Sequence, residues 1–391
     1  MTQLAPVRPA RLAAPAVAGS FLTMLVLGLL VSSLGPLLPA LRDAFGVGPA
    51  AAGVLVASVP TGGLFGVLLS AVMARRYDTR TLLAGACGAL AVGQLGTALA
   101  PAWPLLLASG VVTGIGYGGI TTFVNGMIAA VYGARSTVLL NLANGLFGIG
   151  AVVGPLCVAV VPSRAVYAGY ALLAALAPVL FRSLPPGTPN SPAHVAAPGG
   201  RAHAGRLALF ALVFAGYVAV EVATGGWITS HLRAVDGARE AAVYATSLFF
   251  AGLAVGRLAA APVGLVLGPG PMLFGCAVGM CAGLVLAWAW PVGGVAYALT
   301  GFAMGPIFPT GLAWVSRDQP AARHAIPLVL VAGNAGGLLL PPLVGVLVGA
   351  VGAASAPLPL AAAAAVCACA VGALLVHGGL RSTPCASPSA S

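Results

Sequence analysis

Glu221 is an acidic residue inside the long apolar stretch GYVAVEVATGGWITSHL, which runs from Gly216 to Leu232. The whole chain contains only six acidic residues, so a carboxyl group in such surroundings is conspicuous. A charged carboxylate near the centre of a bilayer costs roughly 2.5 kcal/mol or more unless it pairs with a cation or meets water. A carboxyl group at that depth can also avoid the cost by binding a proton. Glu221 is therefore our candidate for proton coupling or for binding a polar solute.

Other polar side chains follow helical spacing in the apolar stretches. Tyr217, Glu221 and Thr224 lie at positions i, i+4 and i+7, on one face of a helix. Two further sets with such spacing occur earlier in the chain, and polar faces inside spans usually mark a pathway. The residues that we expect to bind the solute are Tyr117, Thr121, Asn125, Asn141, Asn144, Tyr217, Thr224 and Trp227. The structural alternatives are bonds to the helix's own carbonyl groups for threonine, interhelical hydrogen bonds for asparagine and packing for the tryptophan.

Arg257 is the only basic residue well inside an apolar stretch. It pairs with Glu221 if the two helices face each other favourably. The alternatives are that Arg257 reaches the membrane interface or caps a gate, and that Glu221 makes a structural hydrogen bond to a neighbouring helix backbone. The spacing alone leaves these alternatives open.

The composition places these residues in a membrane protein. Of the 391 residues, 60% are hydrophobic and only 6% are charged, whereas about a quarter are charged in an ordinary soluble protein. The net charge of +11 comes from arginines scattered over short loops, which argues against a nucleic-acid partner. None of the seven cysteines forms a metal-ligand pattern, so we expect no metal, cofactor or structural disulfide.

Twelve segments are long and apolar enough to span a bilayer, which predicts an all-α polytopic fold. Arginine counts give their orientation, because basic residues favour cytoplasmic loops. Twelve arginines fall on the side of both termini and four on the other side. Both termini are therefore expected in the cytoplasm. The expected spans are residues 14–39, 50–74, 81–100, 104–132, 136–161, 165–183, 207–231, 241–263, 270–289, 292–315, 326–350 and 356–377.

The chain divides into two halves that resemble each other. Residues 184–205 are rich in proline and glycine and read as a cytoplasmic linker between bundles at 1–183 and 206–391. TGIGYG at 113–118 matches TGFAMG at 300–305, and GPLCVAV at 154–160 matches PPLVGVL at 341–347. A pair of small residues at 62 and 66 matches another at 252 and 256. These matches align spans 2, 4 and 5 with spans 8, 10 and 11. They indicate an internal repeat.

Two six-helix halves joined by a cytoplasmic linker resemble the major facilitator superfamily. The resemblance implies two pseudo-symmetric bundles that rock about a central site, usually in a monomer. The superfamily carries a charged motif between spans 2 and 3, where this chain has AVMARRYDTRTLL. Arg76 and Arg80 fit that motif, Arg75 replaces its acid and Asp78 replaces a glycine. A gating role is therefore expected for Arg76, Asp78 and Arg80, and Arg257 in span 8 is a further gating candidate because it can cap a gate.

Several stretches resemble the fucose–galactose–glucose:proton symporter branch of that superfamily. They are GIGYGGITTFVNGMIA, RSTVLLNLANGLFGIGAVVGP, YVAVEVATGGWI and GPIFPT. Members of the branch often have an acid where this chain has Thr121 and a histidine where it has Asn144. Glu221 is therefore the membrane-embedded acid that remains available for coupling.

We expect a secondary active transporter in the cell membrane that moves a small organic solute with protons. The resemblance implies that this solute is a sugar or another hydroxylated compound. The alternative is efflux of a drug or secondary metabolite by proton antiport, for which an apolar cavity with one acid is also suitable. An enzyme is not expected, because no HExxH motif, aspartate pair or GxSxG elbow occurs at membrane depth.

Overall fold

The structure, a computed structural model, describes residues 12–132, 136–185, 188, 204–236, 239–290, 294–319 and 325–379. These residues form α-helices joined by short turns, with no strand among them. Twelve segments of this part of the chain are long and apolar enough to cross a membrane. The all-α polytopic fold expected from the composition is confirmed.

Each predicted span corresponds to a helix or, in one case, to two successive helices. The N-terminal half contains α1 (Ala14–Phe45), α2 (Pro49–Met73), α3 (Thr79–Leu99), α4 (Trp103–Tyr132), α5 (Ser136–Val160) and α6 (Ser163–Phe181). The C-terminal half contains α7 (Ala204–Asp236), α8 (Arg239–Val266), α9 (Pro269–Ala289), α10 (Val295–Met304), α11 (Ile307–Asp318), α12 (Ala325–Val351), a 3₁₀ turn (Ala353–Ser355) and α13 (Pro357–Gly379). The linker expected at residues 184–205 lies mostly outside the described residues.

Local sequence explains where several helices begin and end. Pro49 and Pro269 occupy first helical positions, where the missing N–H would have had no partner. Asp78 caps α3, because its carboxylate accepts a hydrogen bond from the Thr81 backbone N–H at 3.1 Å. Gly46 ends α1 with φ of 63°, a backbone conformation that glycine adopts at little cost.

The tenth predicted span is interrupted near its middle. Helix α10 ends at Met304 and helix α11 begins at Ile307, with Gly305 and Pro306 between them. Proline has no backbone N–H, and Pro309 follows three residues later, so the regular i→i−4 ladder loses two donors. The sequence GPIFPT thus produces a discontinuous helix, a feature that the span count did not anticipate.

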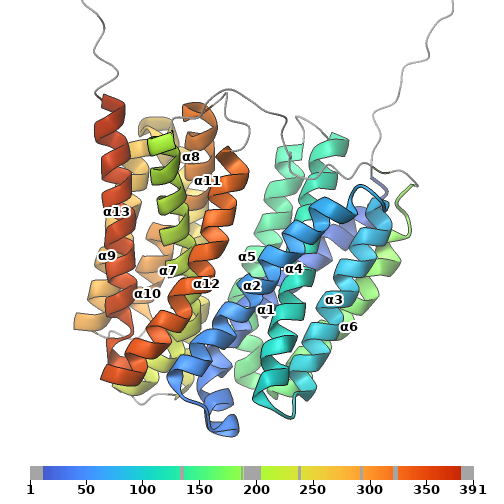
Figure 1. Ribbon diagram of the computed structural model, residues 1–391, viewed down its shortest axis with the longest axis horizontal. Coiled ribbons are helices and arrows are strands. Elements are labelled where there is room, and N and C mark those ends of the chain that lie inside the picture. The colour runs from blue at the N-terminus through green and yellow to red at the C-terminus, as the bar shows by residue number, and fades with distance from the viewer. Residues whose placement is uncertain are drawn as a thin grey trace, which may run out of the picture.

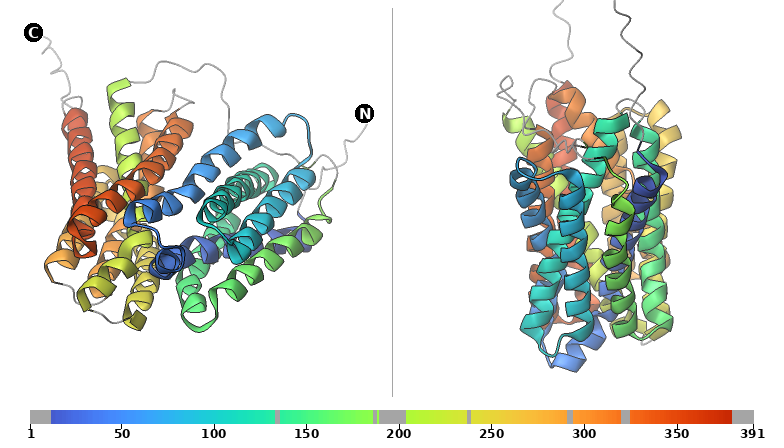
Figure 2. Two further views of the ribbon diagram at one scale, coloured as in Figure 1. Left: turned by 60° about the horizontal axis from the view of Figure 1, so that its bottom comes forward. Right: turned by 90° about the vertical axis from the view of Figure 1, so that its right-hand side faces the viewer.

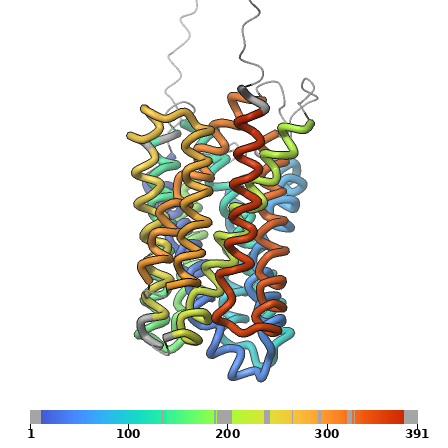
Figure 3. The backbone as a smooth tube through the Cα atoms, turned by 90° about the vertical axis from the view of Figure 1, so that its left-hand side faces the viewer, coloured from blue at the N-terminus to red at the C-terminus, as the bar shows by residue number. Residues whose placement is uncertain are grey.

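The helices stand side by side in two groups (Figure 1). Helix α1 begins and helix α13 ends at the same end of the bundle, here termed the termini face and drawn at the top of Figure 1. Figure 2 shows the two groups from below and from one side, and Figure 3 shows the C-terminal helices running the full height of the molecule. The ribbons of the two groups diverge toward the termini face and converge toward the opposite face.

Glycines allow equivalent helix pairs in the two halves to pack at backbone distance. A Cβ atom at Gly62 of α2 would lie 1.9 Å from the Val111 carbonyl oxygen of α4. At the matching position of the repeat, a Cβ atom at Gly252 of α8 would lie 2.1 Å from the Ala298 carbonyl oxygen of α10. A real Cβ atom essentially never comes within 3.0 Å of such an atom, so both sites require glycine. The repeat seen in the sequence therefore corresponds to equivalent packing.

Glycines also bring the two halves together, but toward the opposite face. A Cβ atom at Gly35, in the second half of α1, would lie 2.0 Å from the Gly225 carbonyl oxygen of α7. A Cβ atom at Gly53, near the start of α2, would lie 2.4 Å from the Pro341 carbonyl oxygen of α12. These positions belong to the helix ends that lie away from the termini face. The described residues therefore close the molecule at the opposite face.

Candidate functional site

Glu221 and Arg257 lie opposite each other between α7 and α8. The Glu221 Oε1 atom is 3.7 Å from the Arg257 Nη2 atom, with side chains 22% and 30% exposed. Glu221 lies midway along α7, near the centre of the bundle. In the described part of the chain it makes this ion pair and no hydrogen bond to a neighbouring backbone. Of the alternatives open from the sequence, the structure has the pair with Arg257.

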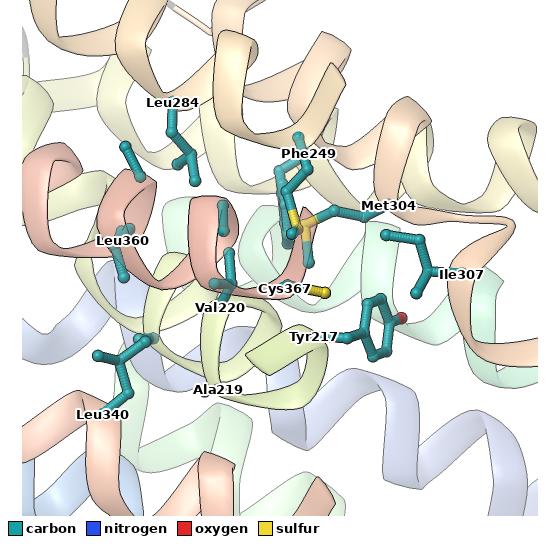
Figure 4. Packing of buried hydrophobic residues seen from close by; sticks show 14 of the residues in the cluster. Tyr217, Ala219, Val220, Phe249, Leu284, Met304, Ile307, Leu340, Leu360 and Cys367 are labelled. Carbon is teal, nitrogen blue, oxygen red and sulfur yellow. The ribbon is translucent and has the colours of Figure 1, made fainter. Parts of the chain in front are cut away.

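Tyr217 joins this pair one helical turn before Glu221. The Arg257 Nη2 group faces the Tyr217 hydroxyl at 3.4 Å, a long hydrogen bond compared with the usual 2.7–3.2 Å. The Tyr217 ring is fully buried and contacts the Phe308 ring at a centroid distance of 6.0 Å. Figure 4 shows Tyr217 at the edge of the buried hydrophobic cluster, on the side of Ile307 and Met304. The hydroxyl thus stands where the apolar core meets the ion pair.

The discontinuous helix forms another wall beside Arg257. A Cβ atom at Gly305 would lie 2.6 Å from the Arg257 backbone nitrogen and 2.5 Å from the Leu253 carbonyl oxygen. The absence of a side chain at Gly305 therefore lets the break between α10 and α11 press against α8 at Arg257. Irregular backbone inside a membrane span is tolerated where it lines a site or is covered by protein.

Tyr117 extends the site into the N-terminal half. It lies on α4, is partly buried, and is close enough to Glu221 and Arg257 to interact electrostatically with both. Its ring lies beside α2, with the Cδ1 atom 3.8 Å from the Cβ position of Gly63. The ion pair of the C-terminal half is therefore within reach of a phenol from the other half.

Three of the expected solute ligands have polar atoms with no hydrogen-bond partner among the described residues. They are the Oδ1 atom of Asn125, the Oγ1 atom of Thr224 and the Nε1 atom of Trp227. Thr224 and Trp227 are almost fully buried. Leaving a buried polar atom without a hydrogen-bond partner costs the folded state roughly 1–3 kcal/mol. Such atoms are therefore candidates for binding water or a ligand.

The other expected ligands are arranged differently. The Thr121 hydroxyl donates to the carbonyl oxygens of Tyr117 and Gly118 in its own helix, at 2.9 and 3.1 Å. The Asn144 side chain is exposed and donates to the Leu140 carbonyl oxygen at 2.8 Å, and Asn141 is also exposed. Asn141 and Asn144 lie in the first half of α5, toward the termini face, and neither has a contact with the ion pair among the described residues.

The expected gating residues lie at the termini face, apart from Arg257. Arg76 and Arg80 are exposed, and Asp78 caps α3. The hydrogen bond from Thr81, together with the nearby Arg80, lowers the pKa of the Asp78 carboxyl group from its ordinary value near 3.8. Asp78 forms no ion pair among the described residues, so it is a helix cap in this conformation. Its gating role stays a prediction.

Sequence reasoning missed two polar contacts. Arg206 at the start of α7 forms a two-pronged contact with the Asp318 carboxylate at the end of α11, and also donates to the Leu374 carbonyl oxygen of α13 at 3.1 Å. His231 and Tyr297 share a buried hydrogen bond of 2.9 Å between α7 and α10. The signal for the first contact was an acid and a base at span ends on the same predicted side of the membrane.

Comparison with solved structures places the fold among transporters. The chain resembles a variant of the nucleoside transporter NupG, with a TM-score of 0.76, 16% identity, and 92% of this chain and 99% of that chain covered. It resembles a bacterial homologue of the human lysosomal transporter Spinster in an inward-facing and unoccupied conformation, with a TM-score of 0.74, 13% identity and coverage of 96% and 98%.

A D-xylose–proton symporter is also similar, with a TM-score of 0.69, 15% identity and coverage of 92% and 96%. At these identities the likeness establishes the fold alone. A comparison with curated protein sequences found no match.

A family model accounts for more than half of the chain. Residues 20–243 match the model described as Major Facilitator Superfamily, whose members are secondary transporters and not enzymes. With twelve segments able to cross a membrane and this match, the chain belongs to the major facilitator superfamily and is a multi-pass membrane transporter.

Proposed function

We propose that the protein carries a small organic solute across the membrane together with protons, and that Glu221 is the residue that takes up and releases the proton. The observation that carries this proposal is the loose ion pair between Glu221 and Arg257, whose nearest charged atoms are 3.7 Å apart at the centre of the bundle. An acid at that depth needs a partner or a proton. A transport cycle in which Glu221 alternates between pairing with Arg257 and binding a proton would couple proton movement to solute movement.

The packing of the halves suggests how the site is reached. Gly35 and Gly53 hold the two halves at backbone distance on the opposite face, whereas Asn141 and Asn144 are exposed toward the termini face. We take residues 1–183 and 206–391 to be the bundles that move against each other, with both termini in the cytoplasm. In that orientation the conformation is open to the cytoplasm. The solute would leave toward the cytoplasm from this conformation in an uptake cycle.

The solute would lie between the halves, against the ion pair. Tyr117, Asn125, Tyr217, Thr224 and Trp227 are the ligands that we favour, because their polar groups are near the pair or lack a partner. Thr121 and Asn144 are weaker candidates, because each side chain already donates a hydrogen bond to a carbonyl oxygen of its own helix. The names of two similar structures, a nucleoside transporter and a D-xylose–proton symporter, agree with a small hydroxylated solute.

Transport by the purified protein in liposomes tests this proposal. We expect a panel of labelled sugars, nucleosides and organic acids to contain a compound that accumulates when the outside is acidic. Glu221→Gln should lower this pH-driven accumulation at least tenfold and leave exchange of the solute between the two sides intact, because exchange requires no net proton movement. Asp43→Asn, which makes the same chemical change at an exposed acid, should retain both activities.

Wild-type accumulation by the Glu221→Gln protein would overturn the proposal. Efflux by proton antiport, the alternative from the sequence, makes a different prediction for whole cells. It requires that cells producing the protein resist a toxic compound, and that an uncoupler removes the resistance. Uptake of a labelled solute without such resistance supports the symport direction.

A further inference from the structure

Two arginines of the C-terminal half are bound very differently. Arg206 contacts both oxygens of Asp318 and the Leu374 carbonyl oxygen, and its side chain is only 11% exposed. Arg257 has one ion-pair contact at 3.7 Å and one long hydrogen bond at 3.4 Å, and it is 30% exposed. A guanidinium group carries five N–H donors. Most donors of Arg257 are therefore available to another acceptor.

The geometry of the guanidinium group indicates which acceptor fits. Its planar fork matches the two oxygens of a carboxylate better than a single hydroxyl group. The Tyr217 hydroxyl lies beside the fork, Tyr117 is within electrostatic range, and the Phe308 ring packs against Tyr217. A carboxylate on a small organic body would thus meet a cation, hydroxyl donors and an aromatic wall.

The two members of the ion pair respond differently to a competitor. If an anion takes the place of Glu221 at Arg257, Glu221 can become neutral by binding a proton. If a cation takes the place of Arg257 at Glu221, the arginine keeps its charge, because a guanidinium does not lose its proton in proteins. The displaced cation would remain charged at the centre of the membrane, which is costly. The pair is therefore suited to an anionic solute and unsuited to a cationic one.

We propose, on the basis of the function proposed above, that the transported solute bears a carboxylate that binds Arg257 in place of Glu221, and that the displaced Glu221 takes the cotransported proton. The salt bridge between Glu221 and Arg257 opens, and a salt bridge between the solute carboxylate and Arg257 forms. A proton from water on the open side binds a Glu221 carboxylate oxygen. One negative charge and one proton enter together, so the net charge of the site is unchanged.

The charged and titratable groups around Glu221 are consistent with this exchange. Arg257 faces it from α8, Tyr217 precedes it on α7, and Tyr117 approaches from α4. No other charged side chain of the described residues interacts with the pair. Transport of a monovalent carboxylate should therefore be electroneutral, driven by a pH difference and insensitive to membrane potential alone.

Binding to the purified full-length protein tests the exchange directly. The probes are lactate, gluconate and benzoate, each compared with its neutral amide, in weakly buffered detergent solution with a pH indicator. We expect at least one carboxylate to bind roughly ten times or more tightly than its amide, with uptake of close to one proton per bound molecule. Equal binding of acid and amide, binding of no carboxylate, or binding without proton uptake overturns the proposal.

Variants separate the two roles. Arg257→Gln should weaken carboxylate binding roughly 10- to 100-fold, the loss expected for hydrogen bonds to a charged group. Glu221→Gln should bind the carboxylate at least as tightly and take up no proton. Arg317→Gln, an exposed arginine of the same half, should match the wild type. If Arg257→Gln does not fold, Arg257→Lys keeps the charge without the fork, and unchanged binding by either folded variant overturns the proposal.

This test is separable from that of the proposed function. Accumulation of a neutral solute that depends on Glu221 and on a pH difference would support proton-coupled transport and reject the carboxylate. Absence of any pH-driven accumulation would reject both.

Discussion

Buried polar side chains differ in whether they form a hydrogen bond to a backbone carbonyl oxygen of their own helix. The buried Thr300 hydroxyl donates to the Ala296 carbonyl oxygen at 2.8 Å, the usual arrangement for a threonine inside a helix. The equally buried Thr224 hydroxyl has no partner among the described residues and lies one turn after Glu221. The Thr224 hydroxyl is therefore not satisfied by its own helix, and its role as a solute ligand stays a prediction.

Thr224→Val tests that role. The two side chains have nearly the same shape, so we expect the melting temperature to stay within a few degrees of the wild type. Loss of one neutral hydrogen bond, about 1 kcal/mol, should raise the KM for the solute about fivefold. Transport kinetics in liposomes measure this, with Thr300→Val as the matched control. A KM that rises equally in both variants would show that Thr224 has no special role.

Part of the site could be read from the sequence, and the reason for the rest is physical. The spacing of Tyr217, Glu221 and Thr224 placed them on one face, because α-helical periodicity is fixed. The spacing also allowed a pair between Glu221 and Arg257, but the rotation of α8 about its axis decides whether the two meet. Periodicity says nothing about whether a hydroxyl such as that of Thr121 turns back to its own helix.

Single elements are held by contacts at their ends. The Arg206–Asp318 pair joins the start of α7 to the end of α11, and the Leu374 carbonyl oxygen adds α13 to the same junction. The two residues are separated by 112 positions, so no local pattern connects them. Because α11 follows the break at Gly305 and Pro306, this pair fixes the far end of a helix that lacks a continuous ladder.

Asp318→Asn should therefore destabilise the protein. Removing one partner leaves Arg206 poorly compensated in a largely buried position, and breaking a buried pair costs about 3 kcal/mol. Thermal unfolding in detergent should show a clear drop in melting temperature. The neighbouring substitution Arg317→Gln should leave it unchanged, since Arg317 is exposed. A combined Arg206→Leu and Asp318→Leu protein should regain part of the loss, and equal instability of the double variant would argue against the pair.

The start of α3 depends on a different kind of contact. Asp78→Ala removes an N-cap, which should cost about 1 kcal/mol, whereas Asp78→Asn keeps a capping oxygen and should cost less. The folded state lowers the pKa of Asp78, so the charged cap contributes fully above the ordinary value near 3.8. That contribution disappears as the pH falls through the lowered pKa. Unfolding measured at pH 7 and below pH 4 should show the wild type and Asp78→Asn converging at acid pH.

At the scale of the whole molecule, the number and extent of the spans could be predicted, because the thickness of a bilayer sets the length of a crossing helix. The glycines matched between the two halves in the sequence also occupy equivalent helix contacts in the structure, because close backbone contact excludes every larger side chain. The break at Gly305 was missed because hydropathy does not report it, although the local prolines Pro306 and Pro309 account for it. The relative position of the halves could not be predicted, because it depends on contacts between distant segments.

The closed opposite face gives a prediction for the moving molecule. In this conformation a Cβ atom at Gly349 would lie 4.0 Å from the Cγ atom of Pro49, which brings α12 and α2 within the range of a disulfide. Pro49→Cys with Gly349→Cys, in a background without native cysteines, should therefore form a bond on mild oxidation. The bond would hold the two halves together at this face.

A transporter that works by alternating access must open the opposite face once in every cycle. The oxidised double variant should accordingly lose at least nine-tenths of its transport, and a reducing agent should restore it. Each single variant should be unaffected by oxidation. Because the bond lies far from Glu221 and Arg257, solute binding from the termini face should persist in the cross-linked protein. Full transport with the bond in place would mean that the two halves do not separate at this face.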